Sequence, residues 1–443
     1  MPYDRPKIVV TPPGPKAQEI MKKDEEMLSP SLSRTAPLVG YKAEGVFVED
    51  PDGNVYLDWG SGIAVVNVGH RNPEVIAAIK EQLDKLIFVN SLDYYTIPQV
   101  EYAEMLFKVT PGNFKKRVFF TNSGSESVDT AIKMAKWHTR RYYGIGYING
   151  FHGRTMGAVT FTTTGLSARR GFFPLYPIAQ FVPYPYCYRC PFKMEYPDCG
   201  MYCMSYLTDV VFKKIVPPDE TAFIIVEPIQ GAGGYIVPPK EFLPTLKKIT
   251  EENGIVLIVD EVQTGFARTG KMFASEHWGV APDIMTISKA IAHGLPAGAA
   301  VAKADIMDWD VGAHEGTLNG NPVVMAAAIA VLKYIQKNKL PERAAKLGDY
   351  LKKRLTELQE KYSIIGDVRG LGLMVGVELV KDEKKTPAKK ERGKLIQEAF
   401  KRGLLLLGAG ESSLRIAPPL IITQEQIDMG LEIFEKVLKD VIS

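Results

Sequence analysis

Three short motifs in this chain of 443 residues carry side chains that could act together on one ligand. The first, Thr121–Ser127, has the sequence TNSGSES, and such small residues before a helix leave backbone N–H groups free to bind a phosphate. Asp260 and Glu261 directly follow an apolar run, where an ionised carboxylate needs a cationic partner or a metal. Lys289 closes a second apolar run, and because burial lowers the pKa of a lysine, it is a candidate for Schiff-base chemistry.

Each motif alone also fits a structural role, such as an N-capped helix or a strand-end lysine that extends into solvent. A phosphate cradle, a crevice carboxylate and a crevice lysine are together what pyridoxal phosphate requires, because its ring nitrogen is the cation that the carboxylate needs. Phe151, in the sequence FHGRT, could supply an aromatic face for the ring. The residues therefore favour pyridoxal phosphate as the cofactor.

The elements that must position these residues form an α/β pattern between about residues 115 and 305. Short β-rich runs alternate with loops and helices, and several runs are apolar at nearly every position, which is typical of strands buried on both faces of a mostly parallel sheet. Ligands of such sheets bind beyond the carboxyl ends of the strands, so the three motifs belong at one edge. The runs are Arg117–Phe120, Phe223–Val226, Ile255–Val259, Ile284–Ile287 and Gly298–Val301.

The chain is too long for one compact core, since single cores stop growing near about 250–300 residues. We expect an N-terminal arm and small-domain segment over residues 1–70, a large cofactor-binding domain over 71–325 and a C-terminal small domain over 326–443. Within the first part, residues 1–40 are rich in proline and predict an extended arm. Asn72 followed by Pro73 predicts the start of a helix.

Composition and charge exclude several classes of protein. Apolar residues make up 46% and charged residues 24% of the chain, which are globular values. The net charge of +3 is too small to indicate a nucleic-acid binder. No apolar run approaches the ~18–20 residues of a membrane helix, and the first residues lack the apolar region of a secretory signal. We therefore expect a cytoplasmic protein without nucleic-acid or membrane partners.

In combination, the motifs resemble those of the class III, fold-type I pyridoxal-phosphate aminotransferases, the group that contains ornithine and 4-aminobutyrate aminotransferases. The resemblance extends over nearly the whole chain, from Leu57 to Arg415. It implies a large domain with a mostly parallel seven-stranded sheet and a smaller α+β domain formed by the N-terminal and C-terminal segments. The matching motifs are Ser123–Glu126, Phe151–Thr155, Glu227-Pro228, Asp260–Gly265 and Ser288-Lys289.

The resemblance also implies the roles of the cofactor-binding residues. Lys289 would hold pyridoxal phosphate through a Schiff base and then move the proton between the substrate carbon and the cofactor. Asp260 would pair with the ring nitrogen and keep it protonated. The other implied contacts are Gln263 to the phenolic oxygen, Gly124 and Ser125 to the phosphate, Phe151 stacked on the ring, Glu227 beside it, and Thr317 to the phosphate from a neighbouring subunit. The Thr317 contact implies a homodimer, or a dimer of dimers, with active sites at the subunit interface.

Two arginines and one aspartate bear on the choice of substrate. In the family, the arginine that matches Arg415 binds an α-carboxylate, and the one that matches Arg154 binds the distal carboxylate of glutamate or 2-oxoglutarate. Ala232 stands where ω-aminotransferases usually have a glutamate that pairs with the second arginine while an ω-amino substrate is bound, and without it Arg415 should stay free for a carboxylate in both half-reactions. Asp93 lies in a segment that lines the site across the dimer interface, where it could hold the ammonium of a diamino acid; a turn or cap role is the plainer alternative.

These residues favour transfer of the ω-amino group of ornithine or lysine to 2-oxoglutarate. Amino-acid racemases or epimerases and 4-aminobutyrate aminotransferases are the alternatives within the family. A racemase needs a second acid or base opposite the lysine, and the absence of an acid at Ala232 counts against it. A catalytically silent regulator that binds pyridoxal phosphate is a further alternative, which the intact Lys289, Asp260 and Arg415 disfavour.

All four cysteines of the chain form one cluster, Cys187, Cys190, Cys199 and Cys203. Their spacing, C-x2-C-x8-C-x3-C, is compatible with disulfides, reduced thiols or a structural metal site. Cytosolic disulfides are a feature of hyperthermophiles, and the many Lys and Glu residues would fit an archaeal hyperthermophile. Transamination itself does not need a cysteine.

Overall fold

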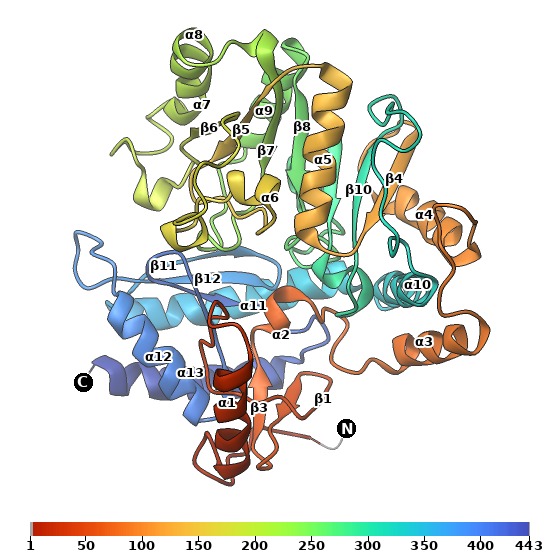
Figure 1. The fold of residues 1–443 in the computed structure, drawn as a ribbon. Helices are drawn as coiled ribbons and strands as arrows, with labels where there is room; N and C mark the ends of the chain where they lie inside the picture. Colours follow the sequence, from red (N-terminus) through yellow and green to blue (C-terminus); the bar gives the residue numbers. More distant parts are fainter. Residues whose placement is uncertain (1–2, 443) are drawn as a thin grey trace.

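The computed structural model describes residues 3–442, and its largest feature is a seven-stranded sheet that fills the upper half of Figure 1. The strands lie in the order β4-β10-β9-β8-β7-β5-β6. Neighbours from β9 to β6 are parallel, whereas β10 is antiparallel to both β9 and β4. The expected α/β fold with a mostly parallel seven-stranded sheet is confirmed. In sheet order, the bounds are Lys116–Thr121, Gly298–Lys303, Ile284–Ile287, Val256–Asp260, Thr221–Val226, Tyr143–Tyr147 and Ala179–Val182.

Strand β7 shows why the central strands are apolar at nearly every position. Its successive side chains point to opposite faces of the sheet. Val226 packs in a core with helix α9 (Phe242–Glu252), and Ile225 packs in a second core with helix α5 (Gly124–Thr139). Because helices cover both faces, the carboxyl ends of the strands remain the place where polar side chains gather.

Two four-stranded sheets lie below the large one in Figure 1. One has the order β1-β2-β3-β13, and β13 pairs with β3 although they come from opposite ends of the chain. The other, β11-β12-β15-β14, is antiparallel throughout. The N-terminal and C-terminal segments thus build one unit together, while boundaries near residues 70 and 325 stay a prediction. The bounds are Lys42–Glu44, Phe47–Glu49, Val55–Asp58 and Leu404–Leu405 in the first sheet, and Ile365–Leu371, Met374–Leu379, Ser413–Ile416 and Leu407–Ala409 in the second.

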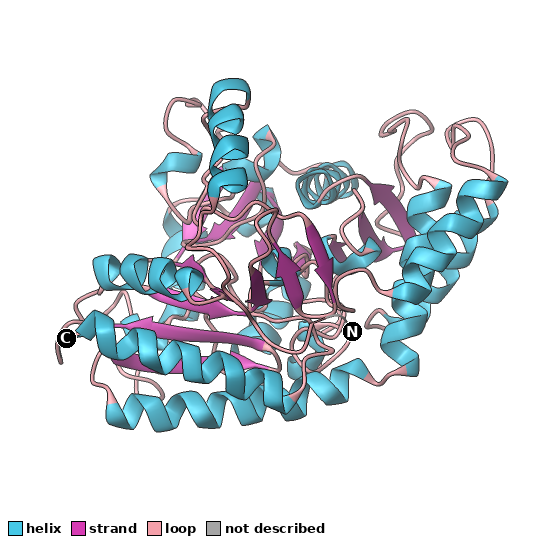
Figure 2. Ribbon diagram, turned by 90° about the horizontal axis from the view of Figure 1, so that it is seen from below, coloured by secondary structure: helices cyan, strands magenta, loops and turns pink. Residues whose placement is uncertain are grey.

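Two long helices begin with the same Asn-Pro pair. The Asn72 side chain accepts hydrogen bonds from the first backbone N–H groups of α3 (Pro73–Lys85), and Asn321 does the same for α10 (Pro322–Lys337). The helix start predicted at Asn72 is therefore confirmed. Figure 2 shows helices along the lower edge and the right-hand side of the sheets. The other helices are α2 Ser61–Ala64, α4 Ile97–Val109, α6 Met156–Thr160, α7 Tyr202–Ser205, α8 Phe212–Lys214, α11 Leu340–Lys361, α12 Lys389–Lys401 and α13 Gln424–Ile442.

The prediction of an extended N-terminal arm is wrong for Pro15–Met27, which form helix α1. The Asp52 carboxylate accepts hydrogen bonds from the backbone N–H groups of Lys16 and Ala17, at 3.0 and 2.9 Å. It thereby caps α1 from a turn that is distant in sequence. The sequence signal for this helix is weak because its cap comes from another segment.

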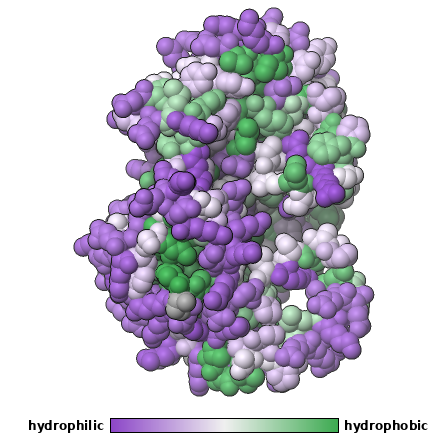
Figure 3. All heavy atoms as spheres, turned by 90° about the vertical axis from the view of Figure 1, so that its left-hand side faces the viewer, coloured by the Kyte–Doolittle hydropathy of each residue, from purple (hydrophilic) through white to green (hydrophobic). Residues whose placement is uncertain are grey.

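No helix within residues 3–442 is long and apolar enough to cross a membrane. The face shown in Figure 3, which is the left-hand side of Figure 1, is mainly polar, with small separate groups of apolar side chains. Large apolar side chains are exposed on the other side of the molecule, around the junction of α3 and α4. We call this set the apolar stripe; it consists of Leu86, Ile87, Phe88, Leu92, Tyr94, Tyr95, Ile97 and Val100.

Candidate active site

A cavity with about 610 Å³ of empty space opens at the carboxyl ends of the central strands. Its lining combines the loop after β4, the FHGRT segment after β5, the turn after β8 and the bend after β9. The structure thus brings together residues predicted separately from three motifs. The lining residues are Ser123, Gly124, Ser125, Phe151, His152, Glu227, Ala232, Asp260, Val262, Gln263, Ser288 and Lys289.

The start of α5 forms one wall of the cavity. Ser123 caps this helix by accepting a hydrogen bond from the backbone N–H of Glu126 at 3.2 Å. The first N–H groups of a helix have no partner within it, so those of Gly124 and Ser125 are suited to a phosphate. A Cβ atom at Gly124 would lie only 3.0 Å from Val262 Cγ1, so a larger residue would crowd this wall.

Asp260 is held on the floor of the cavity by three hydrogen bonds. Its Oδ1 accepts from the backbone N–H of Val262 and the hydroxyl of Thr286, both at 3.1 Å. Its Oδ2 lies 2.7 Å from Nδ1 of the buried His152. Although burial alone would lower the pKa of His152, the bond to Asp260 raises it. Because Oδ2 takes part in one hydrogen bond here, to His152, it keeps a lone pair that can accept a hydrogen bond from a pyridinium N–H.

His152 is a functional residue that the sequence reasoning missed. It appeared only as the second letter of the FHGRT motif, and nothing in that motif shows that it contacts Asp260. The contact joins the segment after β5 to the end of β8, two strands that are not neighbours in the sheet. Its Nε2 is buried without a hydrogen-bond partner within residues 3–442.

Lys289 lies at the bend that follows β9, with a φ of 32°, a value that residues with side chains seldom adopt. Burial lowers the pKa of its ammonium, and the Asp260 and Glu227 carboxylates partly offset this effect. Lys289 lines the cavity together with Asp260 and Glu227. The amine therefore faces the cavity, and because its pKa is lowered it gives up its proton more easily.

Glu227 connects two loops above the cofactor cavity. Its carboxylate accepts hydrogen bonds from the backbone N–H groups of Phe151 at 2.9 Å and Gly231 at 3.0 Å. Burial raises the pKa of Glu227 to about 7, and the neighbouring His152 opposes the shift. Glu227 therefore fixes the position of Phe151 as well as lining the cavity.

These features fit pyridoxal phosphate, and the fit rests on groups with unused bonding capacity. The carboxamide oxygen of Gln263 is buried without a partner in the described part of the chain, so this amide has capacity for a ligand. The helix start at Gly124 suits the phosphate, Oδ2 of Asp260 suits the ring nitrogen, and Lys289 suits the aldehyde carbon. One small molecule of this shape uses all of them.

Four predicted residues do not line the cavity within one chain. Thr317 and Asp93 are exposed, and Asp93 accepts a hydrogen bond from the Asn90 side chain at 2.6 Å. Arg154 is also exposed, with its guanidinium 5.5 Å from the centre of the Phe151 ring. The fourth, Arg415, is half-buried on β15.

Arg415 has no carboxylate partner among residues 3–442, and its Nε is buried without a hydrogen bond. The neighbouring strand β12 carries Glu378, but this acid pairs with Arg369 at 2.8 Å and with Arg189 at 3.0 Å. Although burial raises the pKa of Glu378, Arg369 and its other partners lower it to about 2. Arg415 is therefore a desolvated cation with free donors.

Known proteins resemble this chain over most of its length. A family model described as aminotransferase class-III matches residues 29–438. The chain is 42% identical to the leucine/methionine racemase of Thermococcus litoralis, over 95% of this chain and 96% of the relative. It is 38% identical to the acetylornithine aminotransferase of Caldanaerobacter subterraneus, over 91% of this chain and 95% of the relative.

Among solved structures, an amine transaminase from an uncultivated Pseudomonas species, in its PLP-bound form, superposes with a TM-score of 0.87. It is 32% identical and the match covers 94% of this chain and 98% of that one. Fold, cofactor cavity and sequence similarity thus agree over nearly the whole length. The chain belongs to the class III aminotransferase family and is an enzyme that depends on pyridoxal phosphate.

Proposed function

We propose that this enzyme transfers the ω-amino group of a diamino acid, ornithine or lysine, to 2-oxoglutarate. The observation that carries the proposal is the half-buried Arg415, which has no carboxylate partner within residues 3–442. A desolvated guanidinium without such a partner is well suited to bind the carboxylate of a substrate. Ala232 lines the cavity and brings no carboxylate that could compete for it. Both the diamino acid and 2-oxoglutarate carry a carboxylate that Arg415 can bind.

The chain's own residues supply binding and proton transfer. Pyridoxal phosphate, when bound, supplies an electron-withdrawing ring that stabilises negative charge at the substrate carbon. Lys289 would hold the cofactor and would take a proton from the substrate carbon at Nζ and later give it back, a role that its lowered pKa favours. Asp260, held by His152, would pair with the ring nitrogen of the bound cofactor. Glu227 holds the loop of Phe151, whose side chain would stack on that ring.

We further propose a homodimer in which each subunit completes the other's site. Thr317 and Asp93 are exposed, and their segments contact each other, since Ser91 Oγ donates a hydrogen bond to the Asn319 carbonyl at 2.9 Å. The apolar stripe lies in the same region, with Tyr95 99% and Ile97 83% exposed. A patch of this kind marks an interface rather than a free surface. In the dimer, Thr317 would reach the phosphate and Asp93 the ammonium of the diamino acid.

Racemisation is the second candidate, and the leucine/methionine racemase relative at 42% identity favours it. A racemase removes and returns the α-proton on opposite faces, which requires a second acid or base besides Lys289. The cavity wall at Ala232 offers none. A bound diamino acid whose α-carbon is held away from Lys289 would not racemise.

A donor panel tests the proposal. Ornithine, lysine, leucine and 4-aminobutyrate are each offered with 2-oxoglutarate, and glutamate formation is measured for the natural enzyme, Asp93→Asn and Arg415→Lys. Ornithine or lysine should be the best donor, and Asp93→Asn should raise its KM by about ten-fold or more without a similar effect on a monoamino donor. Arg415→Lys should weaken both half-reactions, because lysine cannot form the two parallel hydrogen bonds. A preference for leucine or 4-aminobutyrate, unaffected by Asp93→Asn, would refute the choice of substrate.

A further inference from the structure

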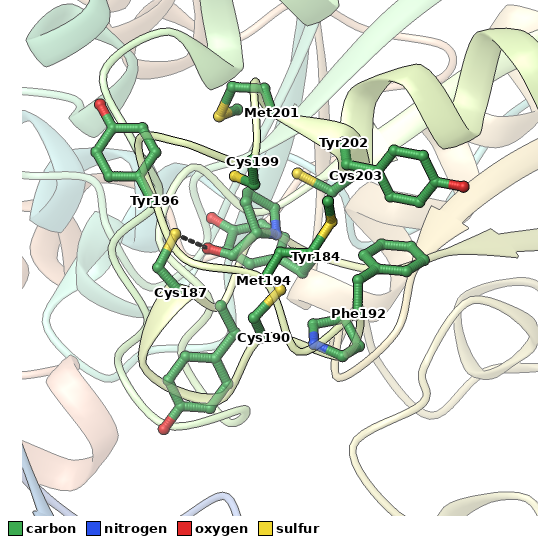
Figure 4. A pocket seen from close by; sticks show the side chains of 13 residues that line it. Tyr184, Cys187, Cys190, Phe192, Met194, Tyr196, Cys199, Met201, Tyr202 and Cys203 are labelled. Atoms are coloured by element: carbon green, nitrogen blue, oxygen red, sulfur yellow. Dashed lines mark hydrogen bonds between the residues drawn. The ribbon is translucent and has the colours of Figure 1, made fainter.

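The four cysteines all line one pocket that is separate from the cofactor cavity. The pocket belongs to the segment between β6 and α7, and Figure 4 shows the four side chains around a common space with aromatic rings outside them. Cys187 is exposed and the other three are half-buried, and all four are free thiols. Neither transamination nor the cofactor site uses this cluster.

The backbone of the segment forms two tight turns that each present two cysteines. In the first, the N–H of Arg189 donates to Tyr186 O and the N–H of Lys193 donates to Cys190 O, both at 3.0 Å. In the second, the N–H of Cys199 donates to Glu195 O at 2.8 Å, and Cys203 follows one helical turn later in α7. Pairs of cysteines on tight turns are a common arrangement of structural zinc sites.

The thiols are arranged around one space and do not form two separate pairs. All four cysteines line the same pocket, and none of them is in a disulfide. Such an arrangement is expected for ligands around one centre. Two independent disulfides would instead separate the cluster into pairs.

We propose that Cys187, Cys190, Cys199 and Cys203 bind one zinc ion, or a similar soft divalent ion, as a tetrathiolate site. Within residues 3–442 no three such side chains are already close enough to coordinate a metal, so binding must draw the sulfur atoms inward. The pocket is open to solvent at the exposed Cys187, which leaves room for this movement. Each thiol releases its proton to solvent as a sulfur–metal bond forms, and no atom changes its oxidation state.

The metal would stabilise a segment that contacts both domains near the active site. The Tyr184 hydroxyl donates to the Glu227 carbonyl at 3.1 Å, on the cofactor side. Tyr186 and Arg189 bind Glu378 at 2.8 and 3.0 Å, on the strand beside that of Arg415. Since the segment has little regular secondary structure, a central metal is its most direct source of rigidity.

The test uses the full-length enzyme loaded with pyridoxal phosphate and purified under reducing conditions with zinc present. After removal of free metal, zinc is counted by plasma mass spectrometry, and the zinc is then replaced by cobalt. We expect about one zinc per chain, and a cobalt spectrum with sulfur-to-metal charge transfer and the strong visible bands of a tetrahedral site. A mercurial reagent that reacts with the thiols should release the zinc.

Matched variants identify the ligands. Cys187→Ser and Cys199→Ser should each weaken zinc binding by about a hundred-fold or more, since a change beside a ligand already costs roughly ten- to hundred-fold. Tyr196→Phe, which lines the same pocket without a sulfur atom, should bind zinc like the natural enzyme. The proposal is overturned by protein that takes up no zinc while its four thiols react freely. Equal zinc in the Cys→Ser variants, or disulfides in place of metal in zinc-supplied protein, would also overturn it.

Discussion

At the scale of single residues, the cofactor site depends on how the Asp260 carboxylate is held. Replacing His152 by Asn removes a 2.7 Å charge-assisted hydrogen bond to Oδ2. Such bonds contribute about 1.5–3 kcal/mol, so pyridoxal-phosphate affinity should fall by roughly ten- to hundred-fold. The measurement is a titration of cofactor-free protein followed by absorbance. His138→Asn, which breaks a histidine–aspartate contact of 2.9 Å at the surface, is the control and should change nothing.

Glu227 gives a prediction about pH. Burial raises its pKa from 4.5 to about 7, so the folded protein holds a proton there that the unfolded chain has lost. Stability should therefore fall as the pH rises from about 4.5 through 7, by about 3 kcal/mol for this group. Glu227→Gln carries no group that ionises there, so it should remove this pH-dependent loss of stability. Urea unfolding of cofactor-free protein near pH 5 and pH 8 should show a smaller difference for Glu227→Gln than for the natural chain, and an equal difference would contradict the assignment.

At the scale of elements, the proposed phosphate site at the start of α5 depends on Gly124, which leaves room beside Val262. Gly124→Ala places a methyl group 3.0 Å from Val262 Cγ1 and 3.4 Å from Ser288 Cβ, which should displace the helix start and weaken cofactor binding by about ten-fold. Gly393→Ala, in the interior of α12 with open space around it, is the matched control. It should leave cofactor binding unchanged and raise stability by about 0.5–1 kcal/mol.

The elements also show what the sequence can and cannot predict. The central strands and the helix start at Asn72 follow from local patterns, and the sequence predicts them. Helix α1 was not predicted, because its cap is the distant Asp52. The contact of His152 with Asp260 was missed for a similar reason. It joins the segment after β5 to the end of β8, and β7 lies between these two strands in the sheet. Local patterns predict elements, whereas contacts between them need the folded chain.

At the scale of the whole molecule, the proposed dimer explains why Asp93 and Thr317 lie outside the cavity of their own chain. Ile97→Asp places a charge in the apolar stripe and should convert the dimer into monomers, with a loss of activity greater than about ten-fold. Ile442→Asp, at the other side of the molecule in Figure 1, is a matched control that should stay dimeric. Light scattering measures the mass, and a dimeric Ile97→Asp enzyme would place the interface elsewhere.

The central claim is that the ω-nitrogen of a diamino acid moves to 2-oxoglutarate. It is tested most directly with L-ornithine that carries heavy nitrogen only at the δ-amine, incubated with the enzyme with and without 2-oxoglutarate. Mass spectrometry of the products should find the label in glutamate, formed only when 2-oxoglutarate is present. Unlabelled glutamate would mean that the α-amine reacts. D-ornithine formed without 2-oxoglutarate would show a racemase, and either result would contradict the proposal.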